Sequence, residues 1–351
     1  MENNVGWLSR GECSALRGIA IMAIVLHNYC HWLGMAVKEN EFTFRAGNST
    51  RLLGELSSPD IYLPVHLFSY FGHYGVPVFL FLSGFGLAVK YGRRDSLPAW
   101  GFARCHYLKL LRMMIPGFVA FTMLDAITPG AFRFHAENVV AQLLMYINLL
   151  PRPDRVIWPG PYWFFGLMMQ FYLVYMLLRR RHWAWTAALM AVCLLLQMLC
   201  DPSGDALNRL RYNFAGGMLA FGTGLLSVRP RLCGLLSRAG RPVWGAVAAV
   251  AALLAFAACF SYHAWLWTPL LVILSAVGTV KVLPRCVLVV CSWLGGISAA
   301  MFVAHPILRK IFIPVSRGGD IYDGLLLYVI ATVAVAWMFR LLINKIPDPR
   351  L

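Results

Sequence analysis

Charged residues are scarce in this chain of 351 residues: only 13% are Asp, Glu, Lys or Arg, while 60% are hydrophobic. A soluble domain of this length needs more polar surface, so the composition favours a chain that crosses a membrane several times. The sequence also lacks the ten-residue segments of alternating polarity that are typical of transmembrane strands. Because backbone groups in lipid must be satisfied internally, the expected fold is all-α, a bundle of transmembrane helices.

No C-x-x-C pair occurs among the nine cysteines, and most of them lie within apolar segments. This spacing excludes the usual zinc and redox motifs and indicates small buried hydrophobic residues. Low-complexity tracts and internal repeats are also missing. The first apolar segment has no small-residue cleavage site, so we expect it to be retained as a helix. A single integral-membrane domain over residues 1–351 is therefore expected.

Acidic residues are much rarer than basic ones, 15 against 31, and the net charge is +16. The basic residues form short clusters between apolar segments, as in cytoplasmic loops that face anionic lipid, so we expect membrane lipids and not nucleic acid as partners. Their distribution predicts that both termini are cytoplasmic. It places a smaller basic group, including Arg309, on the outer side.

Ten apolar segments are long enough to span a bilayer. They cover residues 14–33, 64–89, 111–128, 161–178, 183–200, 212–228, 242–260, 264–282, 286–307 and 324–343. The segment 139–150 is apolar but short, and counting it as a further span would place the RRRH run at 179–182 outside, against the positive-inside bias. We therefore expect 139–150 to be a buried or interfacial segment.

Polar residues interrupt the first apolar segment, LRGIAIMAIVLHNYCHWLG (16–34). At a rise of about 1.5 Å per residue, His27 lies roughly 15 Å beyond Arg17, and His31 follows one turn later on nearly the same face. Polar groups at this depth cost free energy and are retained where they snorkel, pair or function. Three interpretations of the histidines are open: metal ligands, hydrogen-bonded structural residues, or a site that handles protons.

Two further segments carry small or basic residues. The segment FGHYGVPVFLFLSGFGLA (71–88) contains Ser83, Gly84 and Gly86, which allow helices to approach closely. The segment FARCHYLKLLRMMIP (102–116) contains Arg104, Lys109 and Arg112. At the cytoplasmic mouth these residues would either attract phosphates or anchor the chain at lipid headgroups.

Two more segments place polar groups in apolar helices. In GPYWFFGLMMQFYLVY (160–175), an interfacial aromatic belt explains the first residues but not Gln170, which with Tyr172 turns into the span. In WLGGISAAMFVAHPI (293–307), Ser298 and His305 are seven positions apart, so both lie on one side of the helix.

Together these five segments resemble the integral-membrane acyltransferase 3 family, whose members O-acylate surface sugars and polysaccharides. The family has an LRGIA-like run leading to a histidine, a GVDLFFVLSGF-like run (here GVPVFLFLSGF), a basic R…R…P stretch, a WSLSVEEQFY-like segment (here WFFGLMMQFY) and a late S…YL.H helix (here ISAAMFVAH). Nine residues separate Arg17 from His27 where ten are usual, and Pro77 and Met168 stand where acidic residues are expected.

The resemblance implies a cytosolic acyl-CoA donor, most often acetyl-CoA, and a glycan or lipid-linked sugar as acceptor at the outer side of the bacterial inner membrane, with no metal cofactor. His27 is then the expected general base or transient acyl carrier, with Arg17 near the donor. The other expected site residues are His31, Ser83, Gln170, Tyr172, Ser298 and His305.

The same resemblance predicts that the CoA phosphates bind a basic mouth made by Arg93, Arg94, Arg104, Lys109 and Arg112. Two other classes of function remain open from the residues alone. One is a transmembrane transporter of a glycan or lipid-linked intermediate, since buried polar groups also serve transport. The other is a non-catalytic membrane partner in an envelope assembly.

Overall fold

The computed structural model describes residues 6–351, and every regular element in that range is helical. The longer helices are α1 (Arg10–Cys30), α4 (Gly75–Tyr91), α5 (Ala99–Ile127), α8 (Trp163–Leu178), α9 (Trp183–Met198), α11 (Phe214–Ser227), α13 (Arg241–Ala258), α15 (Thr268–Val282), α16 (Arg285–Arg317) and α17 (Ile321–Lys345). The shorter elements are α2 (Ala46–Ser57), α3 (Leu63–Phe71), η1 (Gly72–Tyr74), α6 (Ala136–Leu143), η2 (Ile147–Leu149), α7 (Pro153–Val156), η3 (Gly160–Tyr162), α10 (Asp205–Arg211), α12 (Pro230–Arg238) and α14 (Tyr262–Trp265).

Seven helical segments between residues 6 and 351 are long and apolar enough to cross a membrane: α1, α3 through α4, α5, η3 through α8, α13, α16 and α17. The expected all-helical, multi-pass architecture is therefore confirmed. The other three predicted spans coincide with α9, α11 and α15, which have 16, 14 and 15 residues. A total of ten crossings stays a prediction. The segment 139–150 forms the end of α6 followed by η2, so it is too short to cross.

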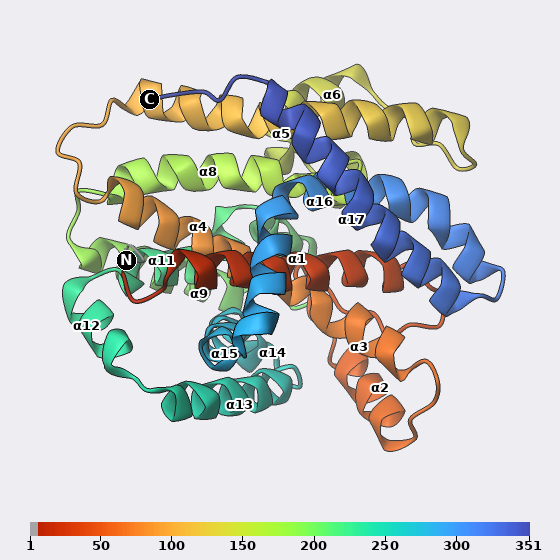
Figure 1. Cartoon of the computed structure of the whole chain (residues 1–351), viewed down its shortest axis with the longest axis horizontal. Helices are drawn as coiled ribbons and strands as arrows, with labels where there is room; N and C mark the ends of the chain where they lie inside the picture. Colours follow the sequence, from red (N-terminus) through yellow and green to blue (C-terminus); the bar gives the residue numbers. More distant parts are fainter. Residues whose placement is uncertain (1–5) are drawn as a thin grey trace.

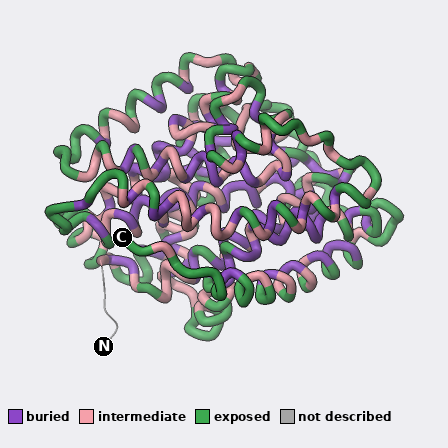
Figure 2. The backbone as a smooth tube through the Cα atoms, turned by 90° about the horizontal axis from the view of Figure 1, so that it is seen from above, coloured by how far each residue is buried: buried purple, intermediate pink, exposed green. Residues whose placement is uncertain are grey.

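The long helices α1, α5 and α8 run roughly parallel to one another in Figure 1, and α4 crosses the view obliquely between α8 and α1. The first turn of α1 lies toward the same side as the C-terminus. Buried backbone is concentrated in the middle of the bundle, and exposed residues follow its periphery (Figure 2). Large apolar side chains such as Leu177, Leu253 and Met338 are exposed. In a multi-pass protein such side chains face the lipid tails, where exposure costs nothing.

Glycines bring pairs of helices into close contact. A Cβ added to Gly18 would lie 1.9 Å from the carbonyl oxygen of Cys291, so α1 and α16 touch through their backbones. In the same way α4 approaches α11 at Gly84, where a Cβ would lie 2.2 Å from the carbonyl oxygen of Phe221. The predicted close approach therefore occurs at Gly84, whereas nothing lies within 4 Å of Gly86.

The start of α1 is fixed by its own cap. Ser9 and Glu12 form a reciprocal capping box that satisfies two free N–H groups of the first turn. The Glu12 carboxylate also pairs with the Nζ of Lys281 at 2.9 Å, which ties the end of α15 to the start of α1. The helix that carries Arg17 and His27 is thus held at its N-terminus by both local and tertiary contacts.

Candidate active site

The bundle contains a cavity of about 530 Å³ that α1 lines along much of its length. Arg17, His27 and His31 of α1 all line this cavity. The opposite walls come from η1, α4, α5, α8 and α16, and connecting loops close one end. At that end the lining residues come from the loop after α1 and from the short elements between the long helices: Asn40, Glu41, Phe42, Thr43, Asp154, Trp158, Asn208 and Tyr212.

His27 is oriented by a contact with the second membrane segment. Its Nδ1 lies 2.8 Å from the carbonyl oxygen of Ser69. Since a carbonyl can only accept, Nδ1 carries the hydrogen, and the Nε2 of the neutral ring keeps its lone pair. His27 is 8% exposed, and this exposure is toward the cavity that it lines. An imidazole held this way can accept a proton from a bound hydroxyl group.

Two more imidazoles surround His27. The ring centroid of His31 lies 4.9 Å from that of His27, and the ring centroid of His73 lies 5.3 Å from it. Nδ1 of His31 and both ring nitrogens of His73 are buried without a hydrogen-bond partner. Within residues 6–351, however, no three His, Cys, Asp or Glu side chains are arranged to hold a metal ion. Both residues line the cavity.

His73 and Arg309 were not among the expected site residues. His73 is a polar residue in an apolar run, which is the signal that could have identified it. Arg309 was expected on the outer side, beyond a span ending at 307. In the structure it lies within a helix, because α16 continues to Arg317. Arg309 is only 6% exposed, lies 4.6 Å from the centroid of the Trp32 ring and lines the cavity.

Arg309 makes no ion pair with an acidic side chain in the described part of the chain. Its Nη1 has weak contacts with Asn28, 3.4 Å to Oδ1 and 3.5 Å to the carbonyl oxygen. Burying a guanidinium group without a counter-ion costs free energy, unless a ligand or a reaction intermediate supplies negative charge. The cavity therefore combines a proton acceptor with a cation suited to anionic charge.

The two expected site residues on α16, Ser298 and His305, differ in their position relative to the cavity. Ser298 lines the cavity, and its hydroxyl donates to the carbonyl oxygen of Gly295 at 2.8 Å. His305 is fully buried behind the cavity wall, with its ring 5.8 Å from that of Phe302. Its Nδ1 lies 3.2 Å from the carbonyl oxygen of Met301, whereas Nε2 has no partner.

Ser83, Gln170 and Tyr172 do not line this cavity. The Ser83 hydroxyl donates to its own helix, to the carbonyl oxygen of Phe79. Gln170 holds the start of α11, because its Oε1 accepts from the backbone N–H of Phe214 at 2.9 Å. Tyr172 packs with its ring centroid 4.3 Å from that of His106.

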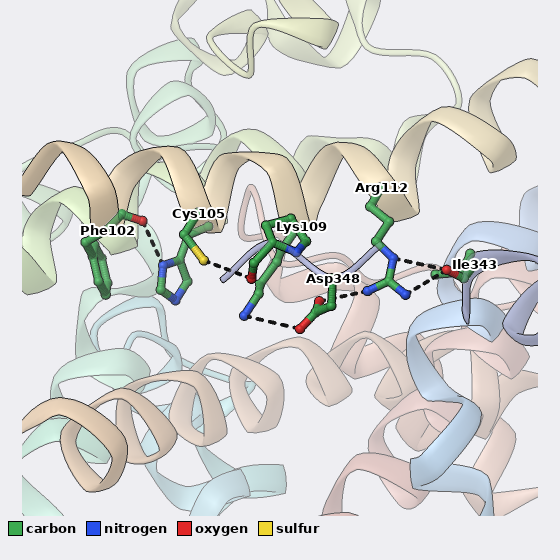
Figure 3. A network of polar contacts seen from close by, with 8 residues as sticks. Phe102, Cys105, Lys109, Arg112, Ile343 and Asp348 are labelled. Atoms are coloured by element: carbon green, nitrogen blue, oxygen red, sulfur yellow. Dashed lines mark hydrogen bonds and ion pairs between the residues drawn. The ribbon is translucent and has the colours of Figure 1, made fainter. Parts of the chain in front are cut away.

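The five basic residues expected to form one cytoplasmic mouth do not gather at a single site in the structure. Figure 3 shows Lys109 and Arg112 turned toward the C-terminal tail. Arg112 pairs with Asp348 at 2.7 Å and donates to the carbonyl oxygen of Ile343, while Lys109 lies 3.9 Å from Asp348. Arg94 lies over the ring of Tyr91. Arg104 is exposed, and Arg93 lines a second cavity.

The loop that contributes Glu41 to the cavity wall contains or contacts ionisable groups whose pKa values are shifted by burial. Glu39 is 2% exposed, and burial raises the pKa of its carboxyl to about 7, although the hydrogen bond from Asn48 opposes this shift. Burial also raises the pKa of Glu41 to about 7 and lowers that of Arg211 to about 10. The side chains of Glu39 and Arg211 are therefore packed inside the protein at this end of the bundle.

The fold and the cavity define a multi-pass helical membrane protein with a histidine-lined internal site. A family model described as an acyltransferase domain matches residues 12–341. The chain therefore belongs to the integral-membrane acyltransferase 3 family, and the resemblance seen in the sequence is confirmed. Neither the comparison with curated proteins nor that with solved structures gives a match. Membership supports acyltransferase activity and gives no support to a transporter.

Proposed function

We propose that this protein moves an acyl group, most simply acetyl, from cytosolic acyl-CoA to a hydroxyl group of a surface glycan or lipid-linked sugar. In this proposal the chain lies in the bacterial inner membrane with ten crossings and both termini cytoplasmic. The donor enters from the side where α1 begins, and the acceptor enters beneath the outer loops. The family supports the acyl transfer, and the cavity supports the arrangement of the two substrates.

One observation carries the proposal: His27 lines a cavity that is also lined by Arg17 and by outer-loop residues. Arg17 and His27 are ten positions apart on α1, which corresponds to roughly 15 Å along the helix axis. Substrates arriving from opposite sides of the membrane can therefore meet beside His27. A buried base with no access from either side would not support this chemistry.

The outer part of the cavity suits a sugar. Asn40, Asp154 and Asn208 provide amide and carboxylate groups for sugar hydroxyls, and Trp158 and Tyr212 provide aromatic faces. Polar groups of fixed orientation confer specificity in such a site, while flat rings supply contact area. These residue types favour a hydroxyl-rich acceptor over a purely apolar one.

The proposed reaction follows from the hydrogen bonding of His27. Nε2 accepts the proton of the acceptor hydroxyl while the oxygen attacks the thioester carbonyl carbon, so that a C–O bond forms. The C–S bond then breaks, and the imidazolium returns its proton to the CoA thiolate. We assign stabilisation of the intermediate oxyanion to Arg309, because the Ser298 hydroxyl already donates to Gly295.

The other residues have supporting roles in this scheme. Arg17 would hold the arm of the donor at the inner end of the cavity. His31, one turn from His27, and His305, behind Phe302, would support the polar environment of the base. Ser83, Gln170 and Tyr172 would shape the surrounding helices. Lys109 and Arg112 would have to release Asp348 before they could bind the donor.

The test is acyl transfer by the full chain in nanodiscs, with radiolabelled acetyl-CoA and surface glycan from cells that lack the protein. His27→Asn keeps an N–H group near the position of Nδ1 but removes the basic nitrogen, so transfer should fall about 100-fold or more. The matched control is His263→Ala, which alters an exposed histidine outside the cavity. Normal transfer by the His27 variant would refute the assigned base, and no transfer by the unaltered protein would refute the proposed function.

A further inference from the structure

A second cavity, of about 760 Å³, lies where several helices end on the side at which α1 begins. Four arginines from four separate segments line it: Arg10 in the first turn of α1, Arg93 after α4, Arg179 at the end of α8 and Arg229 before α12. Arg10 and Arg229 are more than 200 positions apart in the sequence. Tertiary packing alone brings these four side chains together.

No acidic residue lines this cavity. None of the four arginines forms an ion pair with an acidic side chain within residues 6–351. Arg179 donates through Nη2 to the carbonyl oxygen of Arg94, yet its Nε is buried without a partner. Four like charges around one hollow repel each other, and a multiply charged anion would relieve this repulsion.

A single arginine at a helix C-terminus has a simple explanation, since it complements the negative end of the helix dipole. This explanation suffices for Arg93 and Arg179 taken one at a time, and it does not account for convergence on one cavity. Guanidinium groups bind phosphate oxygens in a bidentate manner, which makes phosphate the anion that such a cluster recognises best.

The rest of the lining indicates a ligand larger than inorganic phosphate. Ala88, Val89, Leu225 and Leu226 form an apolar wall, and the buried Thr186 adds a hydroxyl group. A volume of this size is in the range of sites for nucleotide-sized ligands. The cavity thus pairs a polyanion site with an apolar surface against which a planar base can pack.

We propose that the cavity formed by Arg10, Arg93, Arg179 and Arg229 binds phosphate groups, and that these belong to the nucleotide end of the acyl-CoA donor. This inference rests on the proposed function and assigns the donor a binding site apart from the histidine cavity. Arg10 lies 17 positions before His27 on the same helix, or roughly 25 Å. The phosphorylated end and the thioester, at opposite ends of the donor, would occupy the two cavities.

The test measures binding directly. The full chain in nanodiscs of zwitterionic lipid is titrated with adenosine 3′,5′-bisphosphate and with CoA by calorimetry. Arg93→Gln and Arg229→Gln alter exposed residues at the rim, and each should weaken binding of both ligands about tenfold. The matched controls are Arg231→Gln and Arg238→Gln, which alter exposed arginines of α12 that do not line the cavity. Thermal unfolding verifies that each variant is folded.

Each outcome has one meaning. Equal CoA affinity in the cavity variants and the controls would overturn the inference while leaving the proposed function intact. If the bisphosphate does not bind, and an anionic phospholipid copurifies with the unaltered protein but not with Arg93→Gln, the phosphate source is a lipid headgroup and the donor assignment is overturned. Failure of the unaltered protein both to bind CoA and to transfer acyl groups would overturn the proposed function itself.

Discussion

Gly72 stands so close to His27 that a Cβ on the glycine would lie 2.6 Å from the Cβ of the histidine. The same added atom would lie 2.3 Å from the carbonyl oxygen of Ala23. Through this contact η1 packs directly against α1. It accounts for two features of the site: the carbonyl of Ser69 reaches Nδ1 of His27, and the His73 ring packs beside the His27 ring.

We expect Gly72→Ala to damage both stability and activity. The new methyl group would meet backbone and the base-bearing residue, and overpacking of this kind costs about 1–3 kcal/mol. Thermal unfolding in detergent measures the first effect, and acyl transfer measures the second. Gly86→Ala on α4 is the matched control, because nothing lies within 4 Å of Gly86. Equal unfolding temperatures for the two variants would contradict the tight contact.

Arg309→Gln should lower acyl transfer by about 100-fold, the usual effect of removing one oxyanion donor. The loss should also appear in slow hydrolysis of acetyl-CoA without acceptor, since water as nucleophile generates the same oxyanion. The control is Arg133→Gln, which alters an exposed residue outside both cavities. If hydrolysis persists while transfer to the glycan is lost, Arg309 binds the acceptor and does not stabilise the oxyanion.

Asp348→Asn should change neither the stability of the protein nor its KM for acetyl-CoA by much. The Asp348 side chain is 59% exposed, and exposed ion pairs contribute below about 1 kcal/mol. Lys109 and Arg112 would be released from this pair, yet the KM for acetyl-CoA should stay within about twofold because the four-arginine cavity holds the phosphates. A markedly lower KM would instead place Lys109 and Arg112 in the donor site.

Glu39 should make the unfolding temperature depend on pH. Burial raises the pKa of its carboxyl from 4.5 to about 7, so the folded state holds this proton more tightly than the unfolded chain. The stabilisation is complete below the unfolded value, and it is lost as pH rises toward 7.

Glu39→Gln keeps an oxygen that can accept from Asn48 but removes the titration. The unfolding temperature of this variant, relative to that of the unaltered protein, should therefore increase between about pH 5 and pH 8. Glu137→Gln, at an exposed position on α6, is the control and should show no such gain. A difference that does not vary with pH would contradict the raised pKa.

The sequence by itself determined the class of fold and the family. Apolar length and the absence of strand periodicity are local properties, so the helical bundle follows from them directly. The positions of Arg17, His27 and His31 along one helix follow in the same way from its rise and period. Family membership rests on short runs within single helices, which survive in the linear sequence.

Tertiary structure alone decided which polar residues share a cavity. Gln170 and Arg309 are both polar residues in apolar helices, yet the first holds the start of α11 and the second lines the histidine cavity. Likewise, Arg10 and Arg229 line one cavity only because α1 begins on the side where α4, α8 and α11 end. The physical reason is that backbone contacts at glycines such as Gly18 and Gly84 set how the helices cross. Such crossings depend on pairs of distant residues, which periodicity along one segment does not encode.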